Sequence, residues 1–295
     1  MRLLICIDDT DSKTSEKGTG AIADDIKTMV SNHFGVTPTF VSRHQLLIHP
    51  DVPYTSHNSS MCFGAEVPDD RYDELVKRAR EIVSKESDPE SDPGLAIADL
   101  DKVDKEPLIA YGKECKRRLM TKADAYAIAE KAGFFLEELG GTGDGVIGAA
   151  AGIGLRIWGF DGTMKGKPKD LEAGKTYTLG ELTKSRFIEQ VRDVDGNEVP
   201  KDDTIELPNK SKVTLYDGVL TFIVEPVEGE PGRWQPTARE RAKRFGDPRI
   251  YKEGCDRFTP DVEEEQTGDG GCYDCLYRRW IENGILCQKP KEEDA

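Results

Sequence analysis

The 295-residue sequence has no run of about twenty apolar residues and no basic region ahead of a long apolar stretch near its first residue. We therefore expect neither a membrane span nor a signal peptide, and we expect a cytoplasmic protein. Positive charge is also scarce, with 41 Lys and Arg against 56 Asp and Glu and a formal net charge of −15. A surface of that sign repels nucleic acid, so any RNA binding must use a local basic patch.

Two further features are absent. The P-loop signature G-x-x-x-x-G-K-[ST] does not occur, and the seven cysteines are too scattered to predict a disulfide scaffold. Cys6, Cys62 and Cys115 are typical of small core residues. Hydrophobic residues make up 37% and charged residues 33%, which predicts a globular chain of one large domain with an appendage or two medium domains.

An acidic loop near the first residue is the most informative stretch. The apolar run from Leu3 to Ile7 predicts a buried strand, and it ends in Asp8, Asp9 and Asp11. Carboxylates packed this closely repel one another unless a cation holds them, and oxygen ligands suit Mg²⁺. After residues 18–20 (GTG), apolar spacing predicts a helix over residues 21–34, whose first amides suit a phosphate. Together these features indicate a metal–phosphate site.

Other interpretations of the acidic loop remain open. Asp and Ser clusters are also common turn and N-cap residues. An EF-hand loop requires Asp or Asn where Lys13 stands. A strand followed by Asp9-x-Asp11 resembles the motif of haloacid-dehalogenase-type phosphatases, but that family has Thr or Val at the position of Lys13.

A second informative stretch is glycine-rich. We expect a helix from the N-cap Thr121 to about residue 139, and the loop that follows contains Gly141, Gly143 and Gly145. Glycine allows close approach of the backbone to a phosphate, and a small-residue helix follows. A tight turn between closely packed helices is the alternative. Because the loop is expected to follow a helix, the Rossmann fingerprint is excluded.

The predicted fold class is α/β in the broad α+β sense. Residues 1–160 form a mixed-sheet catalytic domain, residues 161–230 a small antiparallel β domain, and residues 231–295 a basic segment with a cysteine-containing tail. Within the first domain we expect a strand through about residue 48 and a helix over residues 105–119. The small β domain also shares its pattern with oligonucleotide-binding barrels, although aromatic residues for base stacking are sparse.

The last 65 residues offer two candidate sites. Residues 239–249 are locally basic and are a candidate surface for tRNA or another RNA, or an ordinary solvated helix. Cys255, Cys272, Cys275 and Cys287 could supply four thiolates to Zn²⁺, or be buried thiols.

Several motifs occur in one order: IDDTDS, HPDVPYTSHNSSMCFGAEV, SDPGLAI and GDGVIGAAAGIG. Over residues 1–157 this set resembles the catalytic half of the TiaS family, the archaeal tRNA-isoleucine agmatinylcytidine synthetases. The resemblance implies an ATP-dependent kinase-like domain that phosphorylates a cytidine carbonyl before agmatine displaces the phosphate. The family has G-M-C-T-T-Y after its acidic loop, including a threonine that becomes phosphorylated. This chain has Gly18-Thr19-Gly20-Ala21-Ile22 there, so only Thr19 could take that role.

By position, the resemblance places Asp8, Asp9 and Asp11 at a catalytic Mg²⁺–ATP site. The residues assigned to ATP are Thr10, Ser12, Gly18, Thr19, Gly20, Asn58, Ser59, Gly141, Gly143, Asp144 and Gly145. The leading hypothesis is an ATP- and Mg²⁺-dependent phosphotransferase or ligase that modifies RNA, with Zn²⁺ as a candidate ligand of the tail. The alternatives are a kinase acting on a small molecule, a phosphate-ester hydrolase with an Asp nucleophile, and a non-catalytic nucleotide- or RNA-binding module.

Overall fold

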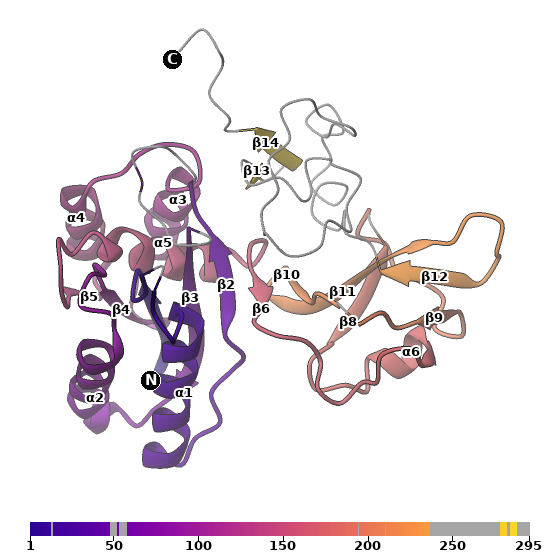
Figure 1. The fold of residues 1–295 in the computed structure, drawn as a ribbon, viewed down its shortest axis with the longest axis horizontal. Helices are drawn as coiled ribbons and strands as arrows, with labels where there is room; N and C mark the ends of the chain where they lie inside the picture. Colours follow the sequence, from indigo (N-terminus) through magenta and orange to yellow (C-terminus); the bar gives the residue numbers. More distant parts are fainter. Residues whose placement is uncertain are drawn as a thin grey trace, which may run out of the picture. The chain divides into compact units, whose positions relative to one another are not determined.

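The chain divides into two compact units, Met1–Trp158 and Gly159–Ala295 (Figure 1). Each unit is described by itself. The computed structural model describes residues 1–12, 14–47, 52, 58–193, 195–209, 211–236, 278–281 and 284–287. The basic segment 239–249 and Cys255, Cys272 and Cys275 therefore lie outside the described residues.

The first unit is built on a five-stranded sheet in the order β5-β4-β1-β3-β2. Every neighbouring pair in it is antiparallel, so the expectation of a mixed sheet in this unit was wrong. The central strand β1 is buried on both faces, which explains why its sequence is a continuous apolar run instead of an alternating one. The strands are β1 (Arg2–Asp8), β2 (Ser42–Gln45), β3 (Ser59–Glu66), β4 (Gly94–Asp99) and β5 (Phe135–Glu138).

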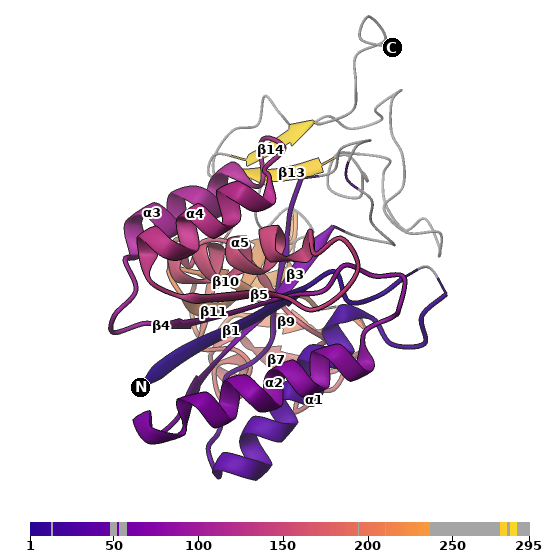
Figure 2. The ribbon, with the colours of Figure 1, turned by 90° about the vertical axis from the view of Figure 1, so that its left-hand side faces the viewer.

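Helices cover both faces of this sheet (Figure 2). Leu3, Ile5 and Ile7 of β1 pack in the core beneath α1 and α2, whereas Leu4 and Cys6 pack in the core beneath α3, α4 and α5. The helices are α1 (Thr19–Phe34), α2 (Tyr72–Glu86), α3 (Lys105–Glu114), α4 (Lys122–Ala132) and α5 (Gly145–Trp158), and a 3₁₀ turn η1 (Asp69–Arg71) precedes α2. No described helix is both long and apolar enough to cross a membrane.

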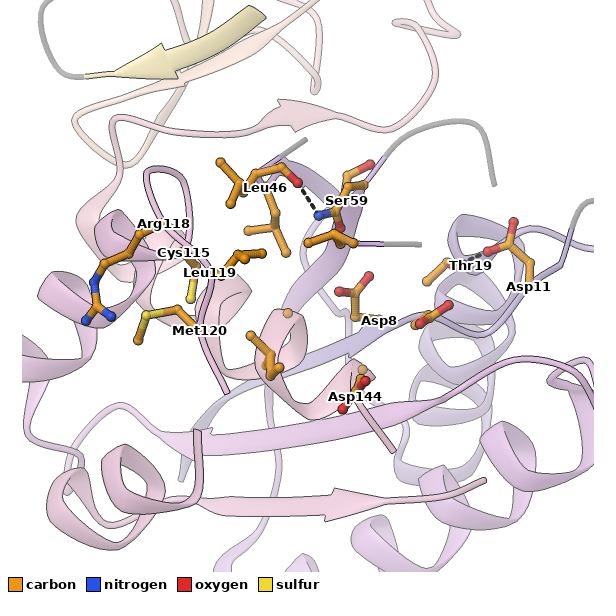
Figure 3. A pocket seen from close by; sticks show the side chains of 17 residues that line it. Asp8, Asp11, Thr19, Leu46, Ser59, Cys115, Arg118, Leu119, Met120 and Asp144 are labelled. Atoms are coloured by element: carbon orange, nitrogen blue, oxygen red, sulfur yellow. Dashed lines mark hydrogen bonds between the residues drawn. The ribbon is translucent and has the colours of Figure 1, made fainter. Parts of the chain in front are cut away.

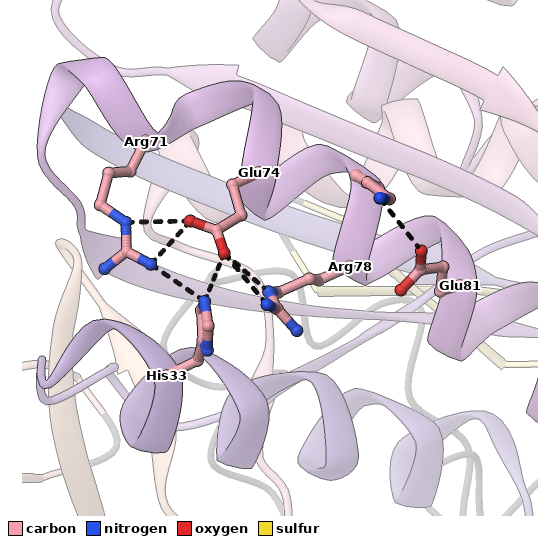
Figure 4. A network of polar contacts seen from close by, with 6 residues as sticks. His33, Arg71, Glu74, Arg78 and Glu81 are labelled. Carbon is pink, nitrogen blue, oxygen red and sulfur yellow. Dashed lines mark hydrogen bonds and ion pairs between the residues drawn. The ribbon is translucent and has the colours of Figure 1, made fainter.

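A polar network joins α1 to α2 on the surface (Figure 4). Glu74 accepts hydrogen bonds from Arg71 at 2.7 Å and from Arg78 at 3.1 Å, and its other partner is His33 of α1 at 2.5 Å. The bond from Arg71 is the main cause that lowers the pKa of Glu74 to about 2, followed by the contact with His33.

Two helix boundaries in the first unit differ from the prediction. The helix expected to continue to residue 139 ends as α4 at Ala132, because Gly133 adopts the left-handed conformation and residues 135–138 pair with β4 as an edge strand. The glycine-rich loop thus follows the strand β5 and not a helix. The exclusion of a Rossmann fingerprint, which relied on a preceding helix, therefore had a wrong basis. β5 is antiparallel to β4, so the loop does not open a parallel βαβ unit. The helix expected over 105–119 ends at Glu114.

The second unit contains a sheet in the order β6-β10-β11-β12-β9-β7, with β8 beside β11. Two pairs in it, β8 with β11 and β9 with β12, are parallel, so the predicted antiparallel β domain is a mixed one. The α+β fold class is confirmed. The elements are β6 (Thr163–Met164), β7 (Thr176–Thr178), α6 (Leu179–Leu182), β8 (Gln190–Asp193), β9 (Thr204–Glu206), β10 (Thr214–Tyr216), β11 (Val219–Pro226), β12 (Arg233–Pro236) and a hairpin of β13 (Arg278–Ile281) and β14 (Gly284–Cys287).

Candidate functional site

A cavity opens where β1 ends, between the N-termini of α1 and α5 (Figure 3). Asp8 is the last residue of β1 and is only 8% exposed. Asp9 turns the chain with a φ of 53°, a left-handed conformation that Asp and Asn adopt more readily than most residues. Asp11 accepts a hydrogen bond from the Thr19 hydroxyl at 2.8 Å, which ties the loop to the first residue of α1.

The carboxylates at this end of the cavity are electrostatically unfavourable to one another. Burial is the main cause that holds the pKa of Asp8 well above its usual range, and the charges of Asp9 and Asp11 act in the same direction. Burial also raises the pKa of Asp9 to about 6, followed by the charges of Asp92, Asp11 and Asp144. Among the described residues, the charges that raise the pKa of Asp9 are thus carboxylates, and a bound cation would relieve this repulsion.

The loop after Asp11 is held by Asp88, which follows α2. The Asp88 carboxylate accepts hydrogen bonds from the Ser12 hydroxyl at 2.9 Å and the Ser15 hydroxyl at 2.6 Å. The Asp88 amide donates to the Thr10 carbonyl at 3.0 Å. The bond from Ser15, followed by those from the Glu90 amide and Ser12, lowers the pKa of Asp88. The loop that carries Asp9 and Asp11 is therefore fixed from outside the cavity.

Two helix N-termini border the carboxylates. The N-cap of α1 is Gly18, which has no side chain to bond the first amides of the helix. Gly145 begins α5, and its amide donates to the Asp92 carbonyl at 2.9 Å. A side chain at Gly148 would overlap Oδ2 of Asp8, so glycine lets α5 lie directly against the acidic strand end. Helix N-termini attract anions, which makes a phosphate group a suitable ligand next to the cation.

Several buried polar atoms near this end of the sheet have no hydrogen-bond partner. The described residues include six such side-chain atoms, and three of them belong to Thr10, Gln45 and Ser60. Ser60 lies opposite His44 on β2, and Gln45 is the last residue of that strand. None of the three lines the cavity, so they mark a buried polar region of the sheet beside it.

The opposite end of the cavity is apolar. Its lining residues come from the end of β2, the turn after α3 and the first turn of α5: Leu46, Leu47, Cys115, Leu119, Met120 and Ile147. Arg118 is the cation at this end, and Figure 3 shows it on the side away from Asp8 and Asp144. The cavity therefore suits a ligand with an anionic, metal-bound part and an apolar, planar part.

The structure brings most, but not all, of the predicted residues together. Those that line the cavity are Asp8, Asp9, Asp11, Thr19, Asn58, Ser59, Asp144 and Gly145. Thr10, Ser12, Gly18, Gly20, Gly141 and Gly143 are not lining residues but belong to the flanking loops and the first turn of α1. Of the cysteines predicted to bind zinc, only the backbone of Cys287 is described, in β14. Within the described residues, no three His, Cys, Asp or Glu side chains form a group that could hold a metal ion.

Sequence reasoning missed three residues of this region. Asp92 lies near Asp9, and its carboxylate accepts a hydrogen bond from the Thr142 amide of the glycine-rich loop. Asp88 holds the acidic loop, and Arg118 stands at the apolar end. The sequence Ser-Asp-Pro occurs twice in residues 87–93 and is typical of a turn. This repeat could have indicated Asp88 and Asp92.

Comparisons with known proteins gave matches only among solved structures. No family model matches the chain, and no curated protein matches it. A crystal structure of a tRNA fluorescent labelling enzyme is 25% identical with a TM-score of 0.46, and one of TiaS in complex with an isoleucine tRNA and ATP is 26% identical with a TM-score of 0.46. Apo TiaS is 23% identical with a TM-score of 0.45. The matches cover 52% of this chain and 35–36% of theirs, so the chain spans about a third of the length of these proteins.

Proposed function

We propose that this protein is an ATP- and Mg²⁺-dependent phosphotransferase or ligase-type enzyme that modifies RNA. One observation supports this most directly: a single cavity combines carboxylates that repel one another, the N-termini of two helices, and an apolar end. A magnesium nucleotide has matching parts, namely a cation, phosphates and a base.

The residues present suit Mg²⁺ in the way that nucleotide enzymes use it. Mg²⁺ is usually held by one or two carboxylates together with substrate phosphates, so a three-residue protein cage is not required. Asp9 and Asp11 would hold it, because Asp9 lines the cavity with a raised pKa and Asp11 is fixed by Thr19. When bound, the ion supplies neutralisation of charge that develops on phosphoryl transfer.

The other residues bind and orient. The first amides of α1, where Thr19 lies, would donate to phosphate oxygens. At α5 the Gly145 amide is already bonded to the Asp92 carbonyl, so this helix would contribute the positive end of its dipole. Asp8 is almost fully buried against α5, which suits a residue that orients the acceptor or the metal-bound groups. Asn58 donates to the Leu47 carbonyl at 2.5 Å and so fixes the wall between the two ends of the cavity.

The proposed acceptor is an RNA nucleobase, as the resemblance to the TiaS family implies. TiaS has been crystallised with a tRNA and ATP, and with AMPCPP and agmatine. A small-molecule acceptor is the second candidate, favoured by the net charge of −15. Residues 239–249 and a zinc site of Cys255, Cys272, Cys275 and Cys287 remain proposals for RNA contact and for the tail.

Calorimetric titration tests the nucleotide site. We expect ATP to bind the wild type only with Mg²⁺ and to lose about tenfold or more of its affinity in Asp9→Asn with Asp11→Asn, since charged metal contacts are lost. Asp101→Asn is the matched control, because Asp101 is an exposed carboxylate paired with Arg2 at 2.5 Å. Metal-independent binding, or an unchanged affinity in the double variant, would refute the assignment. Transfer of label from ATP to RNA, against release of free phosphate only, separates the transferase from a hydrolase.

A further inference from the structure

The turn between α3 and α4 carries a local excess of positive charge. Residues 113–122 read KECKRRLMTK, with five Lys or Arg and one Glu in a chain of net charge −15. Residues 115 and 118–120 of this turn line the apolar end of the cavity. A basic patch therefore lies at the mouth of the candidate site, far in sequence from the basic segment 239–249.

Three of these cations have structural partners. Lys113 lies over the ring of Trp158, with Nζ 4.1 Å from the ring centre. Lys116 is buried and donates to the Gln45 carbonyl at 2.6 Å. Lys122 forms an ion pair with Glu138 at 3.0 Å. These lysines stabilise the fold around the turn and are not the residues to meet a partner.

The two arginines are different. Arg117 is exposed and forms no ion pair with any residue that the structure describes. The side chain of Arg118 is 56% exposed, and its Nε donates to Glu114 at 2.8 Å, one helical turn earlier. That bond engages Nε, and more than half of the side chain remains accessible to a ligand. Guanidinium groups bind phosphate oxygens through several donors at once, which makes this pair a suitable phosphate contact.

An apolar surface adjoins the arginines. Leu119 is 44% exposed, and it and Tyr126 are the large hydrophobic side chains that the described part of the chain leaves exposed. Met120 comes next, and Leu119 and Met120 both line the cavity, as Leu46 does (Figure 3). Ile147 is a further apolar residue of the lining. The apolar surface thus continues from the solvent into the cavity. A nucleobase that leaves its stack needs such apolar side chains to pack against.

We propose that residues 117–120 form an edge over which a single-stranded segment of RNA lies as it enters the cavity. Arg117 and Arg118 contact backbone phosphates, and Leu119 packs against a base. This inference rests on the proposed function for the choice of RNA as the occupant. The acidic end of the cavity repels phosphates that carry no cation, so an RNA backbone is held on the arginine side while one base packs on Leu119 at the rim.

The test is fluorescence anisotropy with a fluorescein-labelled single-stranded RNA of about ten nucleotides. Arg117→Ala with Arg118→Ala should lower the affinity about tenfold at moderate salt and reduce the slope of log K against log salt by about 1.4, which is two phosphate contacts. Leu119→Ala should lower the affinity without changing that slope. The control, Lys77→Ala with Lys131→Ala, removes the same charge from exposed positions on α2 and α4 and should change neither quantity.

The outcomes separate this inference from the proposed function. A wild type that binds no RNA, or an arginine variant that binds RNA like the wild type, overturns the RNA edge even if ATP still binds with Mg²⁺. Polyglutamate that displaces the RNA at equal residue concentration also overturns it, in favour of an acidic polypeptide. Arginine-dependent RNA binding without any binding of ATP supports the edge and refutes the enzyme.

Discussion

Replacing Asp9 by Asn should stabilise the protein in the absence of Mg²⁺. Asp9 is a carboxylate whose pKa is raised to about 6 from 3.8 by burial and by Asp92, Asp11 and Asp144. Asn has nearly the same shape, carries no charge, and adopts the left-handed conformation found at Asp9. The variant therefore removes the unfavourable charge while it keeps the turn.

The pKa shift sets both the size and the pH range of the effect. A rise from 3.8 to about 6 corresponds to at most about 3 kcal/mol, and the partial exposure of Asp9 reduces this to about 1–3 kcal/mol. Because the folded-state pKa is the higher one, the wild type has this stability below 3.8 and loses it as the pH rises through about 6. The variant should melt roughly 3–9 °C above the wild type at neutral pH, with the difference vanishing in acid.

Scanning calorimetry near neutral pH and near pH 4 measures both quantities, with and without Mg²⁺. Mg²⁺ should stabilise the wild type more than Asp9→Asn, because it binds the folded carboxylates. Asp101→Asn is the control and should lower the melting temperature at neutral pH, because the bond from Arg2 lowers the pKa of Asp101. A melting temperature for Asp9→Asn that is unchanged or lower at neutral pH, or a gain that persists in acid, would refute the reasoning.

Two further predictions concern residues outside the cavity. Glu74→Gln should lower the melting temperature at neutral pH, because the pKa of Glu74 is lowered to about 2 from 4.5. The wild type has the corresponding stability above pH 4.5 and loses it as the pH falls towards 2. The melting temperatures of the two proteins should therefore converge in acid. Asp88→Ala should weaken Mg²⁺–ATP binding about five- to tenfold, because it removes the acceptor of the Ser12 and Ser15 hydrogen bonds. Asp88→Asn should retain most of the affinity, because it keeps one acceptor oxygen. Equal affinities of the wild type and both variants in calorimetric titration would show that these bonds do not position the loop for binding.

Local sequence signals predicted the parts of the fold that local interactions determine. The apolar run before Asp8 predicted β1, and the small residues after Gly145 predicted α5, since both patterns reflect burial. The capping box of Thr121 and Asp124 correctly marked the beginning of α4. The resemblance to TiaS agrees with the solved structures that the chain matches over about half its length.

Non-local pairing accounts for what the sequence did not reveal. Residues 135–138 fit a helical pattern as well as a strand, and their pairing with β4 decides between the two. Asp92 approaches Asp9 because β4 lies antiparallel beside β1, so the residues before β4 meet the end of β1. Asp88 and Arg118 likewise acquire their positions only when distant segments come together.

The charge distribution constrains how a nucleotide reaches this cavity. Within the described part of the chain, the charges that shift the pKa of Asp9 are those of Asp92, Asp11 and Asp144, and the whole chain carries −15. A free triphosphate would meet repulsion from both, and the helix N-termini alone offset about one elementary charge between them. The chain's own residues therefore favour a ligand whose phosphates arrive already neutralised by a divalent cation. The arginines that could attract a bare polyanion lie at the other end, beside an apolar wall that suits a base. The acidic end of the cavity thus favours phosphates neutralised by a cation, whereas the arginine end favours an RNA backbone and a base. For this reason, the metal dependence of ATP binding and the arginine dependence of RNA binding can be measured separately.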